Sequence, residues 1–225
     1  VPFVSKATGL QLAKIAAKVM IGFSLKDQGC LDQAIPNFYS VKGPVFPFNK
    51  FPDTDPILGP EMKSTGEVMG TGKTFGEAYI KSQYAAGIHI PENGKVFISV
   101  REPDKNNKLI ELGKFLVDQN FEIIATTGTA DYLTANNINC KQINKVREGT
   151  PHIVELIKAK EVELIINTTE GKQSIQESFS IRAEAVISGI TYYTSLEAAH
   201  ATMSSFNFLG DISVNRLQDY NIKNG

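Results

Sequence analysis

The sequence predicts an α/β protein whose C-terminal part is a five-stranded, parallel, doubly wound sheet. From Lys95 onward, short apolar segments alternate with segments whose apolar residues recur at helical spacing, the pattern of a chain that builds a parallel sheet. Before that point the chain is rich in proline and glycine, which permits short strands but no long regular element. We therefore expect an α+β segment followed by the sheet.

The first segment opens with a predicted amphipathic helix. Thr8 and Gln11 have the spacing of a capping box. Apolar residues between Leu12 and Met20 follow on one helical face, and Gly22 is suited to stop the helix.

A turn-rich stretch separates this helix from a second one. Residues 42–70 read KGPVFPFNKFPDTDPILGPEMKSTGEVMG, where short strands fit. The second helix is predicted from Thr74 through Tyr84, with its end near Gly87. The polar stretch GIHIPENGK follows as a linker. We therefore predict a first unit at residues 1–86, a linker at 87–94 and a second unit at 95–225.

The GTGKT stretch at Gly70–Thr74 invites comparison with a phosphate-binding P-loop. That motif has a glycine, four further residues and then Gly-Lys-Ser/Thr. The position of its first glycine is occupied by Glu67, and Gly66 stands one residue too early. We therefore do not assign a P-loop.

The second unit alternates strands with helices. The predicted strands are residues 95–100, 121–126, 139–144, 162–169 and 189–194. The predicted helices span residues 109–117, 129–137, 151–160, 175–187 and 195–206. The strand at 162–169 is the most apolar, so we place it at the centre of the sheet, where both faces are buried.

Composition excludes several classes of function. The net charge of −1 offers no global field for nucleic acid or an anionic membrane. Lys14 and Lys18 interrupt the most apolar early stretch, which therefore cannot span a bilayer. Only two cysteines occur, Cys30 and Cys140, without a pairing motif, which fits a reducing cytoplasm. The chain starts at Val1 in mid-pattern, which we interpret as the start of a fragment.

Polar loops follow two of the predicted strands. ATTGTA (125–130) and NTTEGKQS (167–174) each lead into a predicted helix, whose N-terminal amides and dipole suit phosphate. Threonine hydroxyls and nearby lysines would add donors and charge, namely Thr126, Thr129, Thr168, Thr169, Lys105, Lys145 and Lys172. The alternative is that the threonines only cap helices and form turns. Two such loops at neighbouring strand ends favour an anion site.

Other residues do not suggest a reaction. The three histidines are widely spaced and lack the neighbours of a metal site. Nothing resembles a nucleophile, histidine and acid set. We therefore predict neither catalytic residues nor a metal site in this chain.

Long strings in the chain resemble carbamoyl-phosphate synthetase large subunits. VPFVSKATG and PFNKFPDTDPILGPEMKSTGEVMG resemble the end of the second ATP-grasp unit of that family. ISVREPDK, ATTGTADYL, INKVREG and IINTTEGKQSIQES resemble its C-terminal regulatory domain, a relative of methylglyoxal synthase. The resemblance covers essentially the whole chain in the family's order.

The resemblance implies a role within a larger enzyme. The parent would be a cytoplasmic, ATP-dependent ligase that makes carbamoyl phosphate from glutamine and bicarbonate for pyrimidine and arginine synthesis. It would use ATP with Mg or Mn and a glutaminase small subunit. The metal-binding residues of the second phosphorylation site lie upstream of the matching strings in that family. The resemblance therefore implies that this chain alone does not catalyse the reaction.

The resemblance also implies an effector site for nucleotides such as UMP and IMP. The family's pattern falls on Lys105, Thr126, Thr129, Lys145, Asn167, Thr168, Thr169, Lys172 and Ser178. Lys172 stands where arginine is common, which keeps the charge but loses the planar fork of a guanidinium. Glu177 stands where aspartate is common.

We expect ornithine to bind weakly or not at all. In ornithine-activated relatives its pocket draws a carboxylate from each of the two segments. Those positions here are Gly43 and Tyr193, so the ammonium groups of ornithine would lose their strongest partners.

Two alternatives compete with effector binding. A lyase of the methylglyoxal synthase type would need catalytic aspartates in the loops NKVREGTPH and NTTEG, which contain none. A structural module would use the same fold for contacts between subunits, including those of a homo-oligomer. Contacts alone would not require the threonines and lysines of the predicted anion site.

Overall fold

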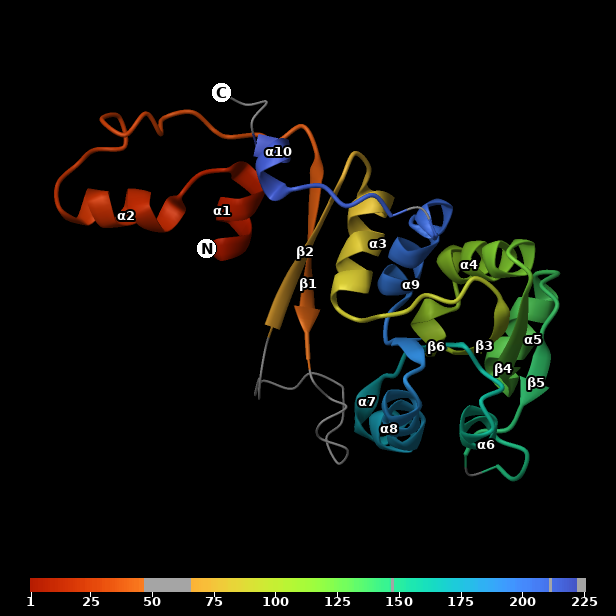
Figure 1. Ribbon diagram of the computed structural model, residues 1–225. Coiled ribbons are helices and arrows are strands. Elements are labelled where there is room, and N and C mark those ends of the chain that lie inside the picture. The colour runs from red at the N-terminus through yellow and green to blue at the C-terminus, as the bar shows by residue number, and fades with distance from the viewer. Residues whose placement is uncertain (47–65, 147, 211, 222–225) are drawn as a thin grey trace.

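A five-stranded parallel sheet organises the second part of the molecule (Figure 1). The computed structural model describes residues 1–46, 66–146, 148–210 and 212–221. The strands are β3 (Gly94–Ser99), β4 (Phe121–Thr126), β5 (Lys141–Ile143), β6 (Leu164–Asn167) and β7 (Thr191–Tyr193). They lie in the order β5-β4-β3-β6-β7, and every neighbouring pair is parallel. The predicted α/β fold with a five-stranded parallel sheet is confirmed.

The middle of the sheet is occupied by β3 rather than β6. The prediction placed the most apolar strand at the centre, and β6 is indeed internal and buried along its whole length. Burial on both faces requires only a neighbour on each side and helices above and below. Apolar content therefore separates internal strands from edge strands but does not rank the internal ones.

Helices cover both faces of the sheet and bury two separate apolar clusters. On one face lie α4 (Asn107–Asp118), α5 (Thr127–Ala135) and α9 (Leu196–Met203). On the other lie α6 (Ile153–Lys158) and α8 (Phe179–Ser188). Phe97 of β3 points into the second cluster while its neighbours Val96 and Ile98 point into the first. This alternation is the two-residue period of a strand buried on both sides.

Two predicted helix faces need correction. The helical spacing of the sequence predicts that Val117 shares one apolar face of α4 with Leu109, Leu112 and Leu116, but Val117 is 41% exposed. The single helix predicted over 175–187 is interrupted at Ser178, so α7 (Gly171–Glu177) and α8 are separate helices. The break changes the phase of the apolar face, which consequently runs through Ile181 and Ala185 rather than through Phe179.

The first segment contains a helix that the sequence did not predict. This helix, α1 (Pro2–Thr8), ends at the residue predicted to cap the next one, and the Thr8 hydroxyl donates to the carbonyl of Val4 at 2.8 Å. The predicted helix is present as α2 (Leu12–Met20). None of its nine residues, all of them described, is buried, so its apolar face is not part of the core.

A two-stranded antiparallel sheet and a helix complete the first segment. The strands are β1 (Tyr39–Val45) and β2 (Gly66–Gly72), and the prolines between them at 47–60 lie outside the described residues. Helix α3 (Phe75–Ala85) agrees closely with its prediction. Its N-cap is Thr74, whose hydroxyl accepts from the Glu77 amide, while the Lys73 amide donates to the Glu77 carboxylate. The last residues of the GTGKT stretch therefore start a helix through its caps.

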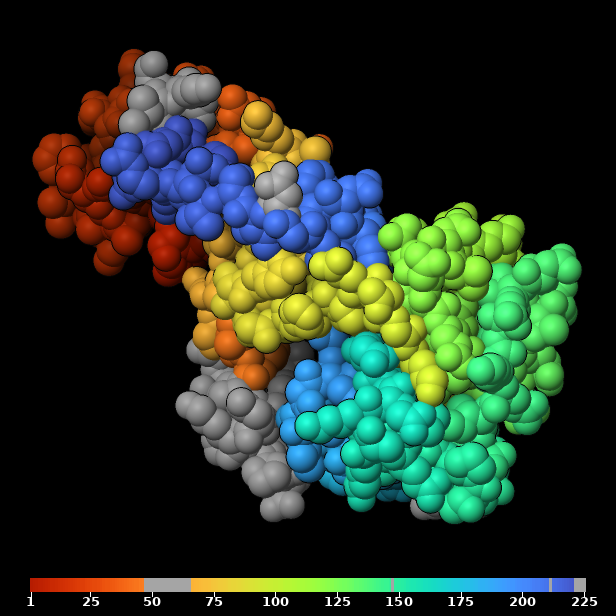
Figure 2. All heavy atoms as spheres, turned by 45° about the vertical axis from the view of Figure 1, so that its right-hand side comes forward, coloured from red at the N-terminus to blue at the C-terminus, as the bar shows by residue number. Residues whose placement is uncertain are grey.

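The two parts of the chain are joined through α3. Its Tyr79 hydroxyl lies 3.5 Å from the carbonyl of Ala198 in α9. The predicted linker is packed, since Ile90 is 1% exposed and the Thr191 hydroxyl donates to the carbonyl of His89. At the far end, α10 (Leu217–Asn221) returns to the first segment, where the Tyr220 ring lies 5.0 Å from that of Phe38 (Figures 1 and 2). The domain boundaries given above stay predictions.

A substitution at Gly76 tests how closely α3 packs against the segment after α9. A Cβ atom at Gly76 would lie 2.0 Å from the backbone oxygen of Ser204, which follows α9. We expect Gly76→Ala to lower the free energy of unfolding by about 1–3 kcal/mol, because the backbones must separate. Urea unfolding measures the change. Ala85→Leu, at an exposed position of the same helix, is the control and should change little. Equal stability of both variants and the unaltered chain would contradict this packing.

Candidate anion-binding site

A cavity of about 440 Å³ lies at the carboxyl edge of the sheet. Its walls come from the ends of β3, β4 and β6, from the segment after β5, and from α7 and α8. Parallel strands end at one common edge, so polar residues that are distant in the chain meet there. The lining residues are Ser99, Val100, Arg101, Glu102, Lys105, Thr126, Gly128, Thr129, Lys145, Val146, Glu148, Ile153, Asn167, Thr168, Ser174, Glu177, Ser178 and Ile181.

Most of the predicted effector residues are brought together in this cavity. Those in its lining are Lys105, Thr126, Thr129, Lys145, Asn167, Thr168 and Ser178. Thr169 and Lys172 lie outside the described lining; Thr169 is half-buried, and Lys172 is exposed at the start of α7. The reason is local geometry. Thr169 and Lys172 lie between the end of β6 and the part of α7 that reaches the cavity, which is lined by Ser174 and Glu177.

Two threonine hydroxyls hold the segment that leaves β3. The Thr129 hydroxyl accepts from the amide of Val100, and the Thr168 hydroxyl accepts from the amide of Arg101, both at 3.1 Å. An amide that bonds to the oxygen leaves the hydroxyl proton available for another acceptor. At Thr129 that proton can serve an anion. Thr168 also hydrogen-bonds the carboxylate of Asp104, so its proton is already engaged.

The first turn of α5 adds backbone donors to the cavity. Thr126 is the N-cap residue, but its side chain makes no capping hydrogen bond within the described part of the chain. Instead its hydroxyl pairs with that of Ser99 at 3.0 Å. The first amides of an α-helix have no partner inside the helix, and the N-cap side chain of α5 does not supply one. They are therefore suited to an anion.

Asn167 contributes a donor that the described protein does not use. The residue is 5% exposed and lines the cavity, and its Nδ2 atom is buried with no hydrogen-bond partner among the described residues. A buried polar group without a partner costs about 1–3 kcal/mol. A ligand acceptor in the cavity would remove that cost.

Three cations line the cavity, one of which sequence reasoning did not single out. The side chain of Lys105 is only 16% exposed, and its Nζ atom would lie 3.2 Å from a Cβ at Gly128, at the start of α5. Lys145 is 59% exposed at the rim. Arg101 was missed, as were Ser99 and Ser174. Ser99 and Arg101 belong to ISVREPDK, where Ser99 is near the end of the strand predicted over 95–100 and Arg101 directly follows it, and this position was the available signal.

The two positions considered for ornithine carry no charge. Tyr193 is 7% exposed, and its hydroxyl oxygen accepts from the Thr202 hydroxyl at 2.7 Å. Burial raises the pKa of the Tyr193 phenol, so the group stays neutral. A Cβ at Gly43 would lie 3.0 Å from a methyl of Val68, which leaves little room for a side chain there. Weak ornithine binding stays a prediction.

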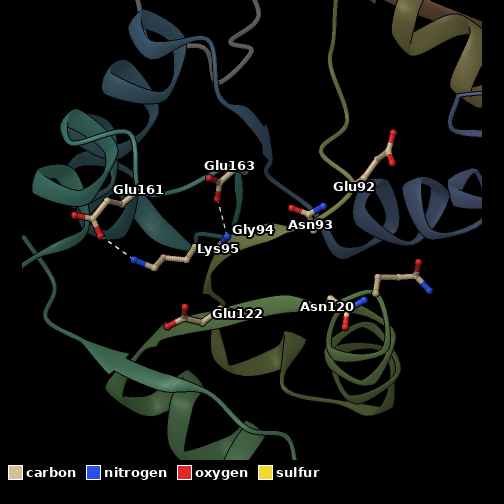
Figure 3. A pocket seen from close by; sticks show the side chains of 9 residues that line it. Glu92, Asn93, Gly94, Lys95, Asn120, Glu122, Glu161 and Glu163 are labelled. Carbon is tan, nitrogen blue, oxygen red and sulfur yellow. Dashed lines mark hydrogen bonds and ion pairs between the residues drawn. The ribbon is translucent and has the colours of Figure 1, made fainter.

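A larger hollow of about 670 Å³ lies at the opposite, amino edge of the sheet (Figure 3). Figure 3 shows the carboxylates of Glu161 and Glu163 directed at Lys95. The first pairs with the Lys95 ammonium at 2.7 Å and the second accepts from the Lys95 amide at 2.6 Å. Both carboxylates therefore already have partners within the protein. In addition, parallel sheets bind ligands at their carboxyl edge. The smaller cavity is therefore the better candidate site.

Two searches of the described residues found nothing further. No group of three or more His, Cys, Asp or Glu among them could hold a metal ion. No helix in the same part of the chain is long and apolar enough to cross a membrane.

Fold and site together define a class of domain. An open parallel sheet with a polar, anion-suited cavity at its carboxyl edge is accompanied by a sequence match: residues 108–194 match the family of MGS-like domains. The chain therefore contains an MGS-like domain, the methylglyoxal-synthase-like fold that the resemblance implied.

The particular relatives are carbamoyl phosphate synthase large chains. The chain is 53% identical over 220 residues to that of Pseudomonas syringae pv. tomato, which covers 97% of this chain and 20% of the relative. It is 50% identical over 219 residues to that of Xanthomonas campestris pv. campestris, with the same two coverages. For Vibrio parahaemolyticus the values are 49% over 223 residues, 99% and 21%. The resemblance to the C-terminal part of these large chains is confirmed, and the chain spans about a fifth of their length.

A substitution at Thr129 tests the hydrogen bond between its hydroxyl and the Val100 amide. Thr129→Val keeps the shape but leaves the buried amide of Val100 without its acceptor. We expect the free energy of unfolding to fall by about 1–3 kcal/mol, measured by urea unfolding. Thr127→Val is the matched control, because Thr127 is exposed and its hydroxyl accepts only from the Gln142 side chain in the described structure. A loss in the control as large as that in Thr129→Val would contradict the role given to Thr129.

Proposed function

We propose that the carboxyl-edge cavity binds a nucleoside monophosphate such as UMP or IMP, and that the chain is the allosteric part of a carbamoyl phosphate synthase large chain. The observation that carries the proposal is the buried Nδ2 atom of Asn167, which lacks a hydrogen-bond partner in the described structure. It lies in a cavity that also contains three cations and the first turn of α5, whose N-cap side chain makes no capping hydrogen bond. The cavity therefore contains a hydrogen-bond donor that no described protein group uses.

We place the phosphate end of the proposed ligand at the first turn of α5. The amides of the first turn of α5, the Thr129 hydroxyl and the ammonium of Lys105 converge at the ends of β3 and β4. A charge-assisted hydrogen bond contributes about 1.5–3 kcal/mol, roughly twice a neutral one. Lys105 should contribute more than Lys145, because its side chain is enclosed and less screened by water.

The rest of the cavity suits a nucleoside. Val146, Ile153 and Ile181 supply an apolar wall, against which a base can pack. Ser174 and Ser178, in and after α7, provide polar groups at the same end. The volume of about 440 Å³ falls among small-molecule sites, which measure roughly 300–1,000 Å³.

The relatives support a place in a larger enzyme. They are named carbamoyl phosphate synthase large chains, and this chain covers only a fifth of them. We propose that the whole protein is a cytoplasmic glutamine-hydrolysing ligase serving pyrimidine and arginine synthesis. It would use ATP with Mg or Mn and a glutaminase small subunit. The chain itself would bind the effector without catalysing the reaction.

Calorimetric titration of UMP and IMP into the chain tests the effector site. We expect Lys105→Ala to weaken binding by about tenfold to a hundredfold, since one charge-assisted bond is lost. Lys145→Ala should weaken it less, because that side chain is more exposed. The control is Lys73→Ala, since Lys73 precedes α3 and does not line the cavity. If Lys73→Ala abolished binding while Lys105→Ala did not, the site would be elsewhere.

Activity assays test the absence of catalysis. We expect the purified chain to show neither ATP turnover with bicarbonate nor methylglyoxal formation from dihydroxyacetone phosphate. The first reaction would need the upstream nucleotide-binding lobe, and the second would need an aspartate base in loops that contain none. Phosphate release and methylglyoxal are measured by absorbance. Robust ATPase activity, or methylglyoxal above the rate in buffer, would contradict the proposal.

A further inference from the structure

Each of the three described cations that line the cavity forms an ion pair with a carboxylate three residues away. Lys105 Nζ lies 2.6 Å from Glu102, and Arg101 Nε lies 2.8 Å from Asp104. Lys145 Nζ lies 4.0 Å from Glu148. The proposed anion would need the same ammonium and guanidinium groups. It therefore has to compete with carboxylates that belong to the site's own loops.

Lys105 and Glu102 form the pair in which the cation is enclosed by the cavity and the acid is exposed to solvent. The lysine side chain is 16% exposed and lies beside the first turn of α5, whereas the glutamate side chain is 83% exposed. Glu102 belongs to the short helix η2 (Glu102–Asp104), which links β3 to α4. The carboxylate can therefore leave Lys105 and enter water without disturbing the core, while the lysine stays in the cavity.

The acids of the other two pairs have further hydrogen-bond partners. Asp104 accepts from the Arg101 guanidinium and also hydrogen-bonds the Thr168 hydroxyl. Partial burial opposes ionisation of Asp104, but these two bonds outweigh it and lower its pKa. Glu148 accepts from the Lys145 amide at 3.0 Å in addition to facing its ammonium. These acids have structural roles, so Glu102 is the one whose chief described partner is a cavity cation.

We propose that Glu102 is an internal competitor for the anion and sets the affinity of the effector site. The inference rests on the proposed function of the cavity. Phosphate binding exchanges the Glu102–Lys105 ion pair for a phosphate–Lys105 pair, and the carboxylate is released to solvent. The affinity is lower than the donor set alone would provide.

The direct test is Glu102→Gln, with UMP as the probe in calorimetric titration. The amide has nearly the shape of the carboxylate but no charge, so Lys105 is released for the phosphate. We expect the Kd for UMP to fall by about two- to fivefold, the range set by one exposed ion pair. An unchanged or higher Kd would overturn the inference. Glu148→Gln, whose amide oxygen can still accept from the Lys145 amide, should lower Kd less, since that pair is longer.

Two controls separate pairing from a general change in charge. Glu197→Gln also removes one negative charge, but Glu197 pairs with Lys108 outside the cavity and should leave the Kd unchanged. In a Lys105→Ala background, Glu102→Gln should tighten binding much less than in the unaltered chain, because an exposed carboxylate acts weakly through water. The same gain in both backgrounds, or an equal gain from Glu197→Gln, would reject Glu102 as a competitor.

The outcomes also distinguish this inference from the proposed function. Binding by the unaltered chain and by Glu102→Gln with equal Kd overturns the inference alone. No binding of UMP or IMP by either protein overturns both. Binding by Glu102→Gln but not by the unaltered chain supports both, because the competitor would then mask the site. Thermal unfolding of each variant confirms that it is folded before titration.

Discussion

The site depends on how the chain is held where it leaves β3. That segment runs between β4 and β6, and a threonine on each side accepts a hydrogen bond from one of its backbone amides. The Thr129 hydroxyl accepts from the Val100 amide, and the Thr168 hydroxyl accepts from the Arg101 amide. The Thr168 amide in turn donates to the Ser99 carbonyl at 3.0 Å. These bonds fix the ends of three strands relative to one another. Lys105, Arg101 and the threonine hydroxyls of the cavity are positioned from those ends, whereas Lys145 follows β5 and the serines Ser174 and Ser178 come from α7 and the residue after it.

The packing below the site explains why the edge is stable. The two apolar clusters on opposite faces of the sheet share β3, whose successive residues alternate between them. The buried Arg182 of α8 donates to the carbonyl of Ile175 at 2.8 Å and so holds α7 next to α8. That contact places Ser174 and Ser178 at the cavity. Burial of apolar residues therefore supports the polar edge through the helices that cover it.

Local charge matters more than net charge in this protein. With a net charge of −1, nothing in the overall field attracts an anion. The cavity gathers three cations, and the adjoining loops supply acids that balance them. A site of this kind recognises a ligand by the geometry of its donors and by the exchange of ion pairs, and less by long-range attraction.

The sequence by itself determined the α/β class, the five parallel strands and most of the polar residues at their ends, because period-two and helical spacing are local properties. Only the tertiary structure decided which of the polar residues meet. Thr169 and Lys172 follow Thr168 closely in the chain, yet neither residue lines the cavity. Arg101 and the partner of each cavity cation were not predictable, since side-chain pairing depends on how loops from separate strands pack. The break at Ser178 was likewise not predictable, since the helical pattern of the sequence is continuous there.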